Sequence, residues 1–174
     1  TPATMDVGQY VLDYTEVALM GPGTRTGAYS YDITQIQGQY MAYLETINYP
    51  NGPEESKTVS ISQVGTIPVG TKSIRFQLGQ PSDGAAGVYP AFSAVQLLIN
   101  GTPMDTVMLS GANSIWDMGA NVSAYAGSSV TMSFQSSSAT APAWSETHAY
   151  LDNIQFSTVA VPEPATLGVL GLGG

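Results

Sequence analysis

The single histidine and the thirteen acidic residues are the side chains of this sequence best suited to acid–base or nucleophilic chemistry. Catalysis by His148 would need an activated nucleophile beside it, but no Gly-x-Ser-x-Gly turn occurs anywhere in the chain. Glycosidases hold two carboxylates at a defined separation. Among thirteen acidic residues some pairs lie close together by chance, so such a pair is no evidence for a glycosidase. The glycine-rich segment 84–87 lacks the lysine of a phosphate-binding loop. We therefore predict no catalytic residue and no enzymatic activity.

Two tryptophans could offer an aromatic face to a sugar. Trp144 lies in the segment 141–146, where no periodic pattern surrounds it. Two interpretations stay open: Trp144 projects outward as a carbohydrate-binding residue, or it folds over the core. Trp116 stands between Ile115 and a nearby Met118 and is predicted to be a core residue. The ten tyrosines fit either an interaction face or ordinary β-strands on two sheets.

Acidic residues outnumber basic residues by 13 to 4, which gives a formal net charge of -9. The last basic residue is Arg75, so the C-terminal half of the sequence is uniformly acidic. Nucleic acid and anionic membrane surfaces are therefore poor partners, whereas divalent cations are natural counterions. Calcium prefers the oxygen ligands that acidic loops supply. Because the sequence contains no cysteine, it has neither a disulfide framework nor a thiolate metal site.

The spacing of turn-forming residues predicts an all-β protein. Glycine, proline, serine and threonine recur about every eight to twelve residues, and no segment between them sustains a helical period. Asn100-Gly101 predicts a hairpin between a strand at 92–99 and a return strand through 104–109. Further strands are expected at 11–20, 27–33, 39–47, 58–62, 73–78, 130–135 and 149–157, and residues 122–125 lead to a turn.

The last predicted strand changes phase within its length. Leu151 and the pair Ile154 and Phe156 are apolar but fall on opposite parities, which predicts a β-bulge near Asp152-Asn153. About eight to ten alternating strands most often close as two packed sheets. The predicted fold is all-β, a jelly-roll-type antiparallel β-sandwich with an extended C-terminal tail.

The C-terminal segment joins a rigid polar hinge to apolar and glycine residues. Two prolines around one carboxylate fit neither a helix interior nor a sheet ladder, so we expect a single domain at 1–158 and an extended tail at 159–174. The eight residues after Thr166 are too few for a membrane span of about 20 residues. Apolar side chains on such a tail need a groove on their own domain or on a neighbour. The proposed assembly residues of the tail are Val161, Pro162, Glu163, Pro164, Leu167, Val169, Leu170 and Leu172.

The run Val-Pro-Glu-Pro-Ala-Thr at 161–166, followed by leucine and glycine, resembles the PEP-CTERM sorting signal of bacterial exported proteins. In that signal the motif precedes a transmembrane helix and a basic cluster, and a membrane protease, exosortase, reads it. The helix and the basic cluster are missing here. The segments 61–76, 98–101, 122–127 and 150–157 resemble the jelly-roll domain of many such exported proteins, which is similar to carbohydrate-binding and galactose-binding-like modules.

This resemblance implies an exported bacterial protein at the cell surface or in the extracellular biofilm matrix, with exosortase as a partner during export. It also implies a structural calcium ion bound by an acidic residue near the start of the domain and by an aspartate in the last strand. Asp152 matches the second position, and Asp13 or Glu16 matches the first. The alternative is that Asp152 and Asn153 cap their own bulge by hydrogen bonds, and both interpretations stay open.

Three functional classes follow. The first is an extracellular structural protein that self-associates into a fibre, tube or lattice, with its tail added to a sheet of a neighbouring subunit. The alternative is a cell-surface carbohydrate-binding module associated with exopolysaccharide, in which Trp144 contacts the sugar. A hydrolase is the third class and has the least support.

Overall fold

The computed structural model describes residues 3–4, 17–20, 40–48, 58–80, 95–112, 114–137 and 145–162. The strand predicted at 27–33 therefore lies outside the described residues. Among the described residues, no helix is long and apolar enough to cross a membrane. The elements are β1 (Ala3–Thr4), β2 (Val17–Met20), β3 (Met41–Asn48), β4 (Thr58–Thr66), β5 (Ser73–Gly79), β6 (Val95–Ile99), β7 (Thr102–Pro103), β8 (Thr106–Ala112), β9 (Ile115–Asn121), the 3-10 helix η1 (Ser123–Tyr125), β10 (Ser129–Ser137) and β11 (Ser145–Ser157).

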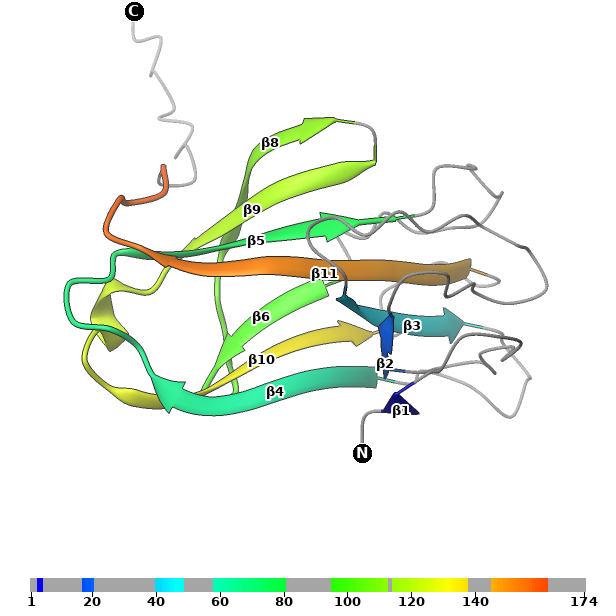
Figure 1. Ribbon diagram of the computed structural model, residues 1–174, viewed down its shortest axis with the longest axis horizontal. Helices are drawn as coiled ribbons and strands as arrows, with labels where there is room; N and C mark the ends of the chain where they lie inside the picture. Colours follow the sequence, from blue (N-terminus) through cyan, green and yellow to red (C-terminus); the bar gives the residue numbers. More distant parts are fainter. Residues whose placement is uncertain are drawn as a thin grey trace, which may run out of the picture.

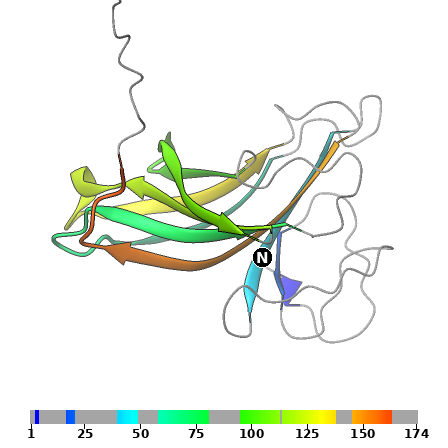
Figure 2. The ribbon, with the colours of Figure 1, turned by 90° about the horizontal axis from the view of Figure 1, so that it is seen from above.

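The strands form two sheets that pack as a sandwich (Figures 1 and 2). The seven-stranded sheet has the order β1-β2-β3-β11-β5-β9-β8, and the four-stranded sheet has the order β4-β10-β6-β7. Every neighbouring pair is antiparallel except β1 and β2. The pairs β3–β11, β4–β10 and β5–β9 are nested along the chain and alternate between the sheets, which is the arrangement of a jelly roll. The predicted all-β sandwich is confirmed.

The core lies between the two sheets, where alternate residues of each strand meet. On β5, Ile74, Phe76 and Leu78 are buried in the core, as their alternation in the sequence predicts. The rings of Phe76 and Phe134 join the two sheets in an edge-to-face contact, with centroids 4.9 Å apart and an interplanar angle of 71°. Trp116 is partly buried against the same core, in agreement with its predicted place.

The hairpin predicted at Asn100-Gly101 is confirmed, because β6 and β7 pair across these two residues. Their φ values of 52° and 79° are those that a two-residue type I′ turn requires. The predicted return strand at 104–109 is only partly right: Met104 N–H donates to the Leu97 carbonyl over 2.9 Å, and residues 106–109 belong to a strand, but that strand does not pair with β6. The return strand β7 ends at Pro103, which has no N–H for the ladder, and the chain then crosses to the other sheet, where β8 pairs with β9.

The bulge predicted in the last strand is confirmed. The register of β11 against β5 shifts between Asp152 and Gln155, and Asn153 has a φ of 51°. The strand itself begins earlier than predicted, at Ser145, so that His148 lies inside β11 rather than before it. Strand β9 is absent from the sequence-based prediction, although Trp116 and Met118 alternate with Asp117 and Gly119 along it.

A second apolar cluster lies on the outer face of the seven-stranded sheet, the face turned away from the four-stranded sheet. It consists of Ala18, Met20, Met41, Tyr43 and Tyr150, all of them buried. The inner face of the same strands carries Leu44 and Leu151 of the main core. The seven-stranded sheet is therefore buried on both faces where β2, β3 and β11 lie side by side.

Candidate functional site

An open pocket lies on the outer face of the seven-stranded sheet, across the four neighbouring strands β11, β5, β9 and β8. Because Ile74, Phe76 and Leu78 face the core, the intervening Arg75 and Gln77 project to the outer face. The cavity volume is about 290 Å³. Its lining residues are Arg75, Phe76, Gln77, Leu109, Ser110, Asp117, Asn153 and Gln155.

A chain of hydrogen bonds crosses this pocket from strand to strand. Gln155 Nε2 donates to Asn153 Oδ1, and Asn153 Nδ2 donates to Gln77 Oε1 over 3.3 Å. Gln77 Nε2 in turn donates to Asp117 Oδ1 over 2.8 Å. The hydroxyl of Ser110 donates to the second carboxylate oxygen of Asp117. The pocket floor is thus a continuous network of amide, hydroxyl and carboxylate groups.

The bulge in β11 is what places Asn153 in this network. Asp152 pairs with Gln77, and Gln155 pairs with Arg75, so two residues of β11 stand opposite the single Phe76 of β5. Asp152 lies on the outer face with Gln77, so in a regular strand the next residue, Asn153, would face the core. The extra residue and its positive φ turn the side chain instead to the outer face, where it bonds to Gln77.

Asp117 is the anionic centre of the pocket. Hydrogen bonds from Ser110 and Gln77, and the charge of Arg75, hold the pKa of its carboxyl below its usual value, against an opposing effect of burial. The carboxylate is therefore ionised at neutral pH. Arg75 is half-buried, and its Nε has no hydrogen-bond partner among the described residues. The pocket thus presents one carboxylate and one guanidinium side by side.

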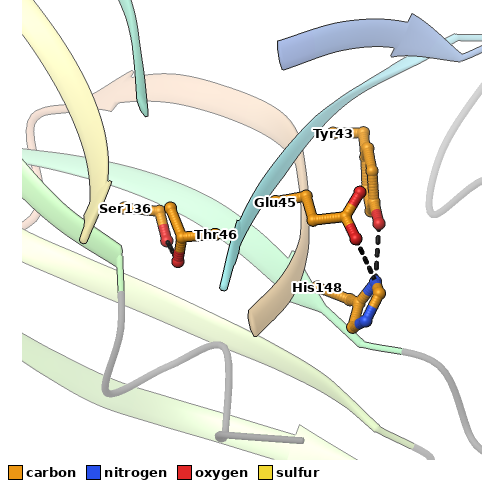
Figure 3. A network of polar contacts seen from close by, with 5 residues as sticks. All are labelled: Tyr43, Glu45, Thr46, Ser136 and His148. Carbon is orange, nitrogen blue, oxygen red and sulfur yellow. Dashed lines mark hydrogen bonds and ion pairs between the residues drawn. The ribbon is translucent and has the colours of Figure 1, made fainter. Parts of the chain in front are cut away.

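His148 belongs to a different, buried group on the same face of the sheet (Figure 3). Its Nδ1 lies 2.6 Å from the Tyr43 hydroxyl and 3.8 Å from Glu45 Oε1. The Tyr43 ring also stacks on Tyr150, with centroids 5.5 Å apart. All four side chains are buried, so the polar group and the second apolar cluster form one packed unit. We assign this group a packing role between β3 and β11.

The second contact in Figure 3 lies on the other face of β3. The hydroxyls of Thr46 and Ser136 are 3.4 Å apart, and neither residue has any exposed surface. Thr46 belongs to the seven-stranded sheet and Ser136 to the four-stranded sheet. This bond therefore ties the two sheets together inside the core.

The predicted calcium ligands are only partly within the described residues. Asp152 is half-buried in β11, and its Oδ1 accepts a hydrogen bond of 2.7 Å from the backbone N–H of Asn153. That bond is the one expected if Asp152 caps its own bulge. Asp13 and Glu16 lie outside the described residues, and the described part of the chain contains no group of three potential metal ligands. The calcium site stays a prediction.

Of the residues proposed for carbohydrate binding and for the tail, only Val161 and Pro162 are described. Trp144 lies outside the described residues, as do Glu163, Pro164, Leu167, Val169, Leu170 and Leu172.

The start of the tail, from the end of β11 to Pro162, contacts its own domain. Val161 is 9% exposed, and it fills the space above Gly119 of β9, where a Cβ atom would meet Val161 Cγ1 at 2.6 Å. Ser73 Oγ donates a hydrogen bond of 2.7 Å to the carbonyl of Val159. Pro162 is exposed. The direction in which the chain leaves the sandwich is thus fixed by contacts before the Pro-Glu-Pro motif.

Strand β4 forms one border of the four-stranded sheet, and among the described strands only β10 pairs with it. Eight of its nine residues are exposed, and none is charged. Ile61 is 36% exposed and Val64 is 70% exposed. We call the side of β4 opposite to β10 the β4 edge. Its backbone N–H and C=O groups are a template for one more strand.

The pocket residues and the β4 edge were not singled out from the sequence as functional. Gln77 and Asp117 are 40 positions apart, and Asn153 and Gln77 are 76 apart, so no local spacing brings them together. Comparison with known proteins adds nothing to this assignment: no family description fits the chain, and neither the curated proteins nor the solved structures give a match.

Proposed function

We propose that this chain is an extracellular structural protein that self-associates into a fibre, tube or lattice by adding a strand to the β4 edge. The observation that carries the proposal is the exposure of eight of the nine β4 residues together with the absence of charge along the whole strand. Soluble proteins ordinarily protect such an edge with lysine, proline or a bulge. The chain has a net charge of -9, but β4 carries no charged residue, so no charge on this strand opposes pairing with another strand.

The geometry of the edge suits an added strand. In an antiparallel ladder, alternate residues direct both the N–H and the C=O toward the same side, so nine residues offer roughly four or five paired positions. The exposed Ile61 and Val64 lie on opposite faces of β4 and give an incoming strand an apolar neighbour on each face. Main-chain hydrogen bonds would supply the affinity, and contacts with Ile61 and Val64 would fix the register of the added strand.

The occupant that fits best is the apolar tail of a second copy. The segment 166–174 is uncharged, as β4 is, and carries four branched apolar side chains. In Figure 1 β4 lies at the lower border of the sandwich, whereas the orange-red residues after β11 leave it at the upper left. The Val161 contact starts the tail on that far side, which favours a neighbour's β4 over its own. Such a head-to-tail contact runs on into a filament unless its rotation closes a ring.

Light scattering and negative-stain electron microscopy of the purified full chain test this proposal. The variant Val64→Lys places a charge on β4, and Val69→Lys is the matched control, since Val69 is 89% exposed but lies in the turn after β4. We expect Val64→Lys to abolish assemblies that the unmodified chain and Val69→Lys form. Deleting 167–174 should abolish them too. Loss on the β4 change but not on the deletion would identify β4 of a second copy as the occupant, and assembly unaffected by both changes would contradict the proposal.

A further inference from the structure

We propose that the outer-face pocket binds a small neutral polyol, such as one sugar unit, independently of the proposed self-association. The pocket is lined by Arg75, Gln77, Ser110, Asp117, Asn153 and Gln155, with Leu109 as an apolar wall. No residue of this set was assigned a function from the sequence.

Hydroxyl-rich ligands match these groups because each hydroxyl both donates and accepts a hydrogen bond. Asp117 is ionised and can only accept, and Arg75 can only donate. Vicinal hydroxyls satisfy both at once, one donating to the carboxylate and the next accepting from the guanidinium. The amides of Asn153 and Gln155 donate and accept at the rim.

The pairing of opposite charges in the pocket favours a neutral ligand. An anionic ligand would meet Asp117 within a chain of net charge -9, and Arg75 is one of only four basic residues. A cationic ligand would meet Arg75. A neutral ligand is the class that neither the carboxylate nor the guanidinium repels.

The volume of the pocket limits the size of the ligand. Its volume of about 290 Å³ lies just below the range of roughly 300–1,000 Å³ that is typical of ligand sites. That is room for one small ring rather than for several. Among the described lining residues Phe76 is the only aromatic one, and its ring packs on Phe134 in the core rather than facing the pocket. For a ligand of this size we expect a Kd on the order of 1 mM.

Saturation-transfer difference NMR on the full chain tests this site, since the method reads the ligand and works for single molecules and for assemblies. The probes are glucose, galactose, mannose and sorbitol, with glucuronate and glucosamine as the anionic and cationic counterparts. The pocket variants are Asp117→Asn and Gln155→Ala. The matched control is Gln63→Ala, an exposed glutamine on β4. Thermal unfolding checks that each variant is folded.

We expect saturation transfer to at least one neutral probe, weaker transfer to glucuronate and glucosamine, and a loss of affinity of about fivefold or more in both pocket variants. The Gln63→Ala variant should bind as the unmodified chain does. Three results would overturn the proposal: no transfer to any neutral probe at about ten times the expected Kd, stronger transfer to a charged sugar, or binding that folded Asp117→Asn and Gln155→Ala retain in full. Because the β4 variant Val64→Lys leaves the pocket intact, its binding separates this proposal from the self-association.

Discussion

The side chain of Val161 occupies the space that a Cβ atom on Gly119 would need, with Val161 Cγ1 2.6 Å from the position of that atom. Gly119 lies on the outer face of β9, opposite Arg75 of β5, and Leu109 of β8 closes the same space at 3.1 Å. Because Gly119 has no side chain, β9 leaves space for the side chain of Val161, the residue that precedes the Pro-Glu-Pro motif. Leu109, which lines the pocket, and Val161, at the start of the tail, thus both pack over Gly119.

Gly119→Ala should displace Val161. A contact of 2.6 Å cannot be kept, and Val161 is the partner able to move. We expect a loss of about 1–2 kcal/mol in the free energy of unfolding, from exposing most of one valine side chain, and faster proteolysis after residue 157. Denaturant unfolding and limited proteolysis measure the two effects. Gly65→Ala is the control, because nothing lies within 4 Å of its added Cβ. Equal stability of the two variants would contradict the Val161 contact.

Tyr43→Phe should destabilise the fold although it keeps the ring. The hydroxyl bonds to His148 Nδ1 at 2.6 Å in a fully buried position, and its loss removes a buried hydrogen bond. We expect the free energy of unfolding to fall by about 1–3 kcal/mol. Tyr40→Phe is the matched control, since Tyr40 is 57% exposed and its change should be close to neutral. If thermal unfolding gave the same Tm for both variants, the packing role of the Tyr43–His148 group would be wrong.

Asp117→Asn should change how stability depends on acidity. The folded-state pKa of Asp117 lies below its ordinary value of 3.8. The ionised carboxylate therefore stabilises the fold fully above pH 3.8, and this contribution is lost as the pH falls from 3.8 through the lowered folded-state pKa. We expect the unmodified chain to have the higher Tm near neutral pH and the difference to close as the pH falls through the lowered pKa of Asp117. The effect is small because the carboxylate is open to solvent. A Tm difference that stayed constant or widened on acidification would contradict this account.

Asp152→Ala tests the two interpretations of the bulge. Removing the carboxylate deletes the 2.7 Å hydrogen bond to the Asn153 N–H, at a residue whose φ is positive. We expect a loss of about 1 kcal/mol that is the same with calcium and with a chelator. Thermal unfolding in both buffers measures it. A loss that appears only in the presence of calcium would favour the ion site predicted from Asp152, Asp13 and Glu16.

Local patterns in the sequence were sufficient to predict most of the sandwich. The alternation of Ile74, Phe76 and Leu78 predicts β5, and Asn100-Gly101 predicts the turn after β6, because each depends on residues close in the chain. The bulge in β11 is also predictable from the sequence, because the apolar residues Leu151 and Phe156 occupy odd and even positions of the same strand. Strand β9 could have been found in the same way. Its core-facing Trp116 and Met118 alternate with Asp117 and Gly119.

The pocket and the packing of Val161 over Gly119 could not be predicted from local patterns. Gln77, Asp117 and Asn153 come from three strands, and which strands are neighbours depends on the nested pairing of the whole jelly roll. On their own strands they are ordinary polar residues of a solvent-facing side. Gly119 likewise carries no local sign that its missing Cβ receives Val161. The exposure of β4 follows from its place at a border, which depends on the sheet order and not on its own sequence.

Amide hydrogen exchange of β4 at increasing protein concentration is the most direct test of the central claim, which is that the chain self-associates through the β4 edge. At low concentration residues 58–66 should exchange faster than the neighbouring β10, because among the described strands only β10 pairs with β4. At high concentration we predict protection of 58–66 to rise while that of β10 stays unchanged. If 58–66 kept the same exchange rates while light scattering reported assemblies, the chain would associate through another surface and the claim would be wrong.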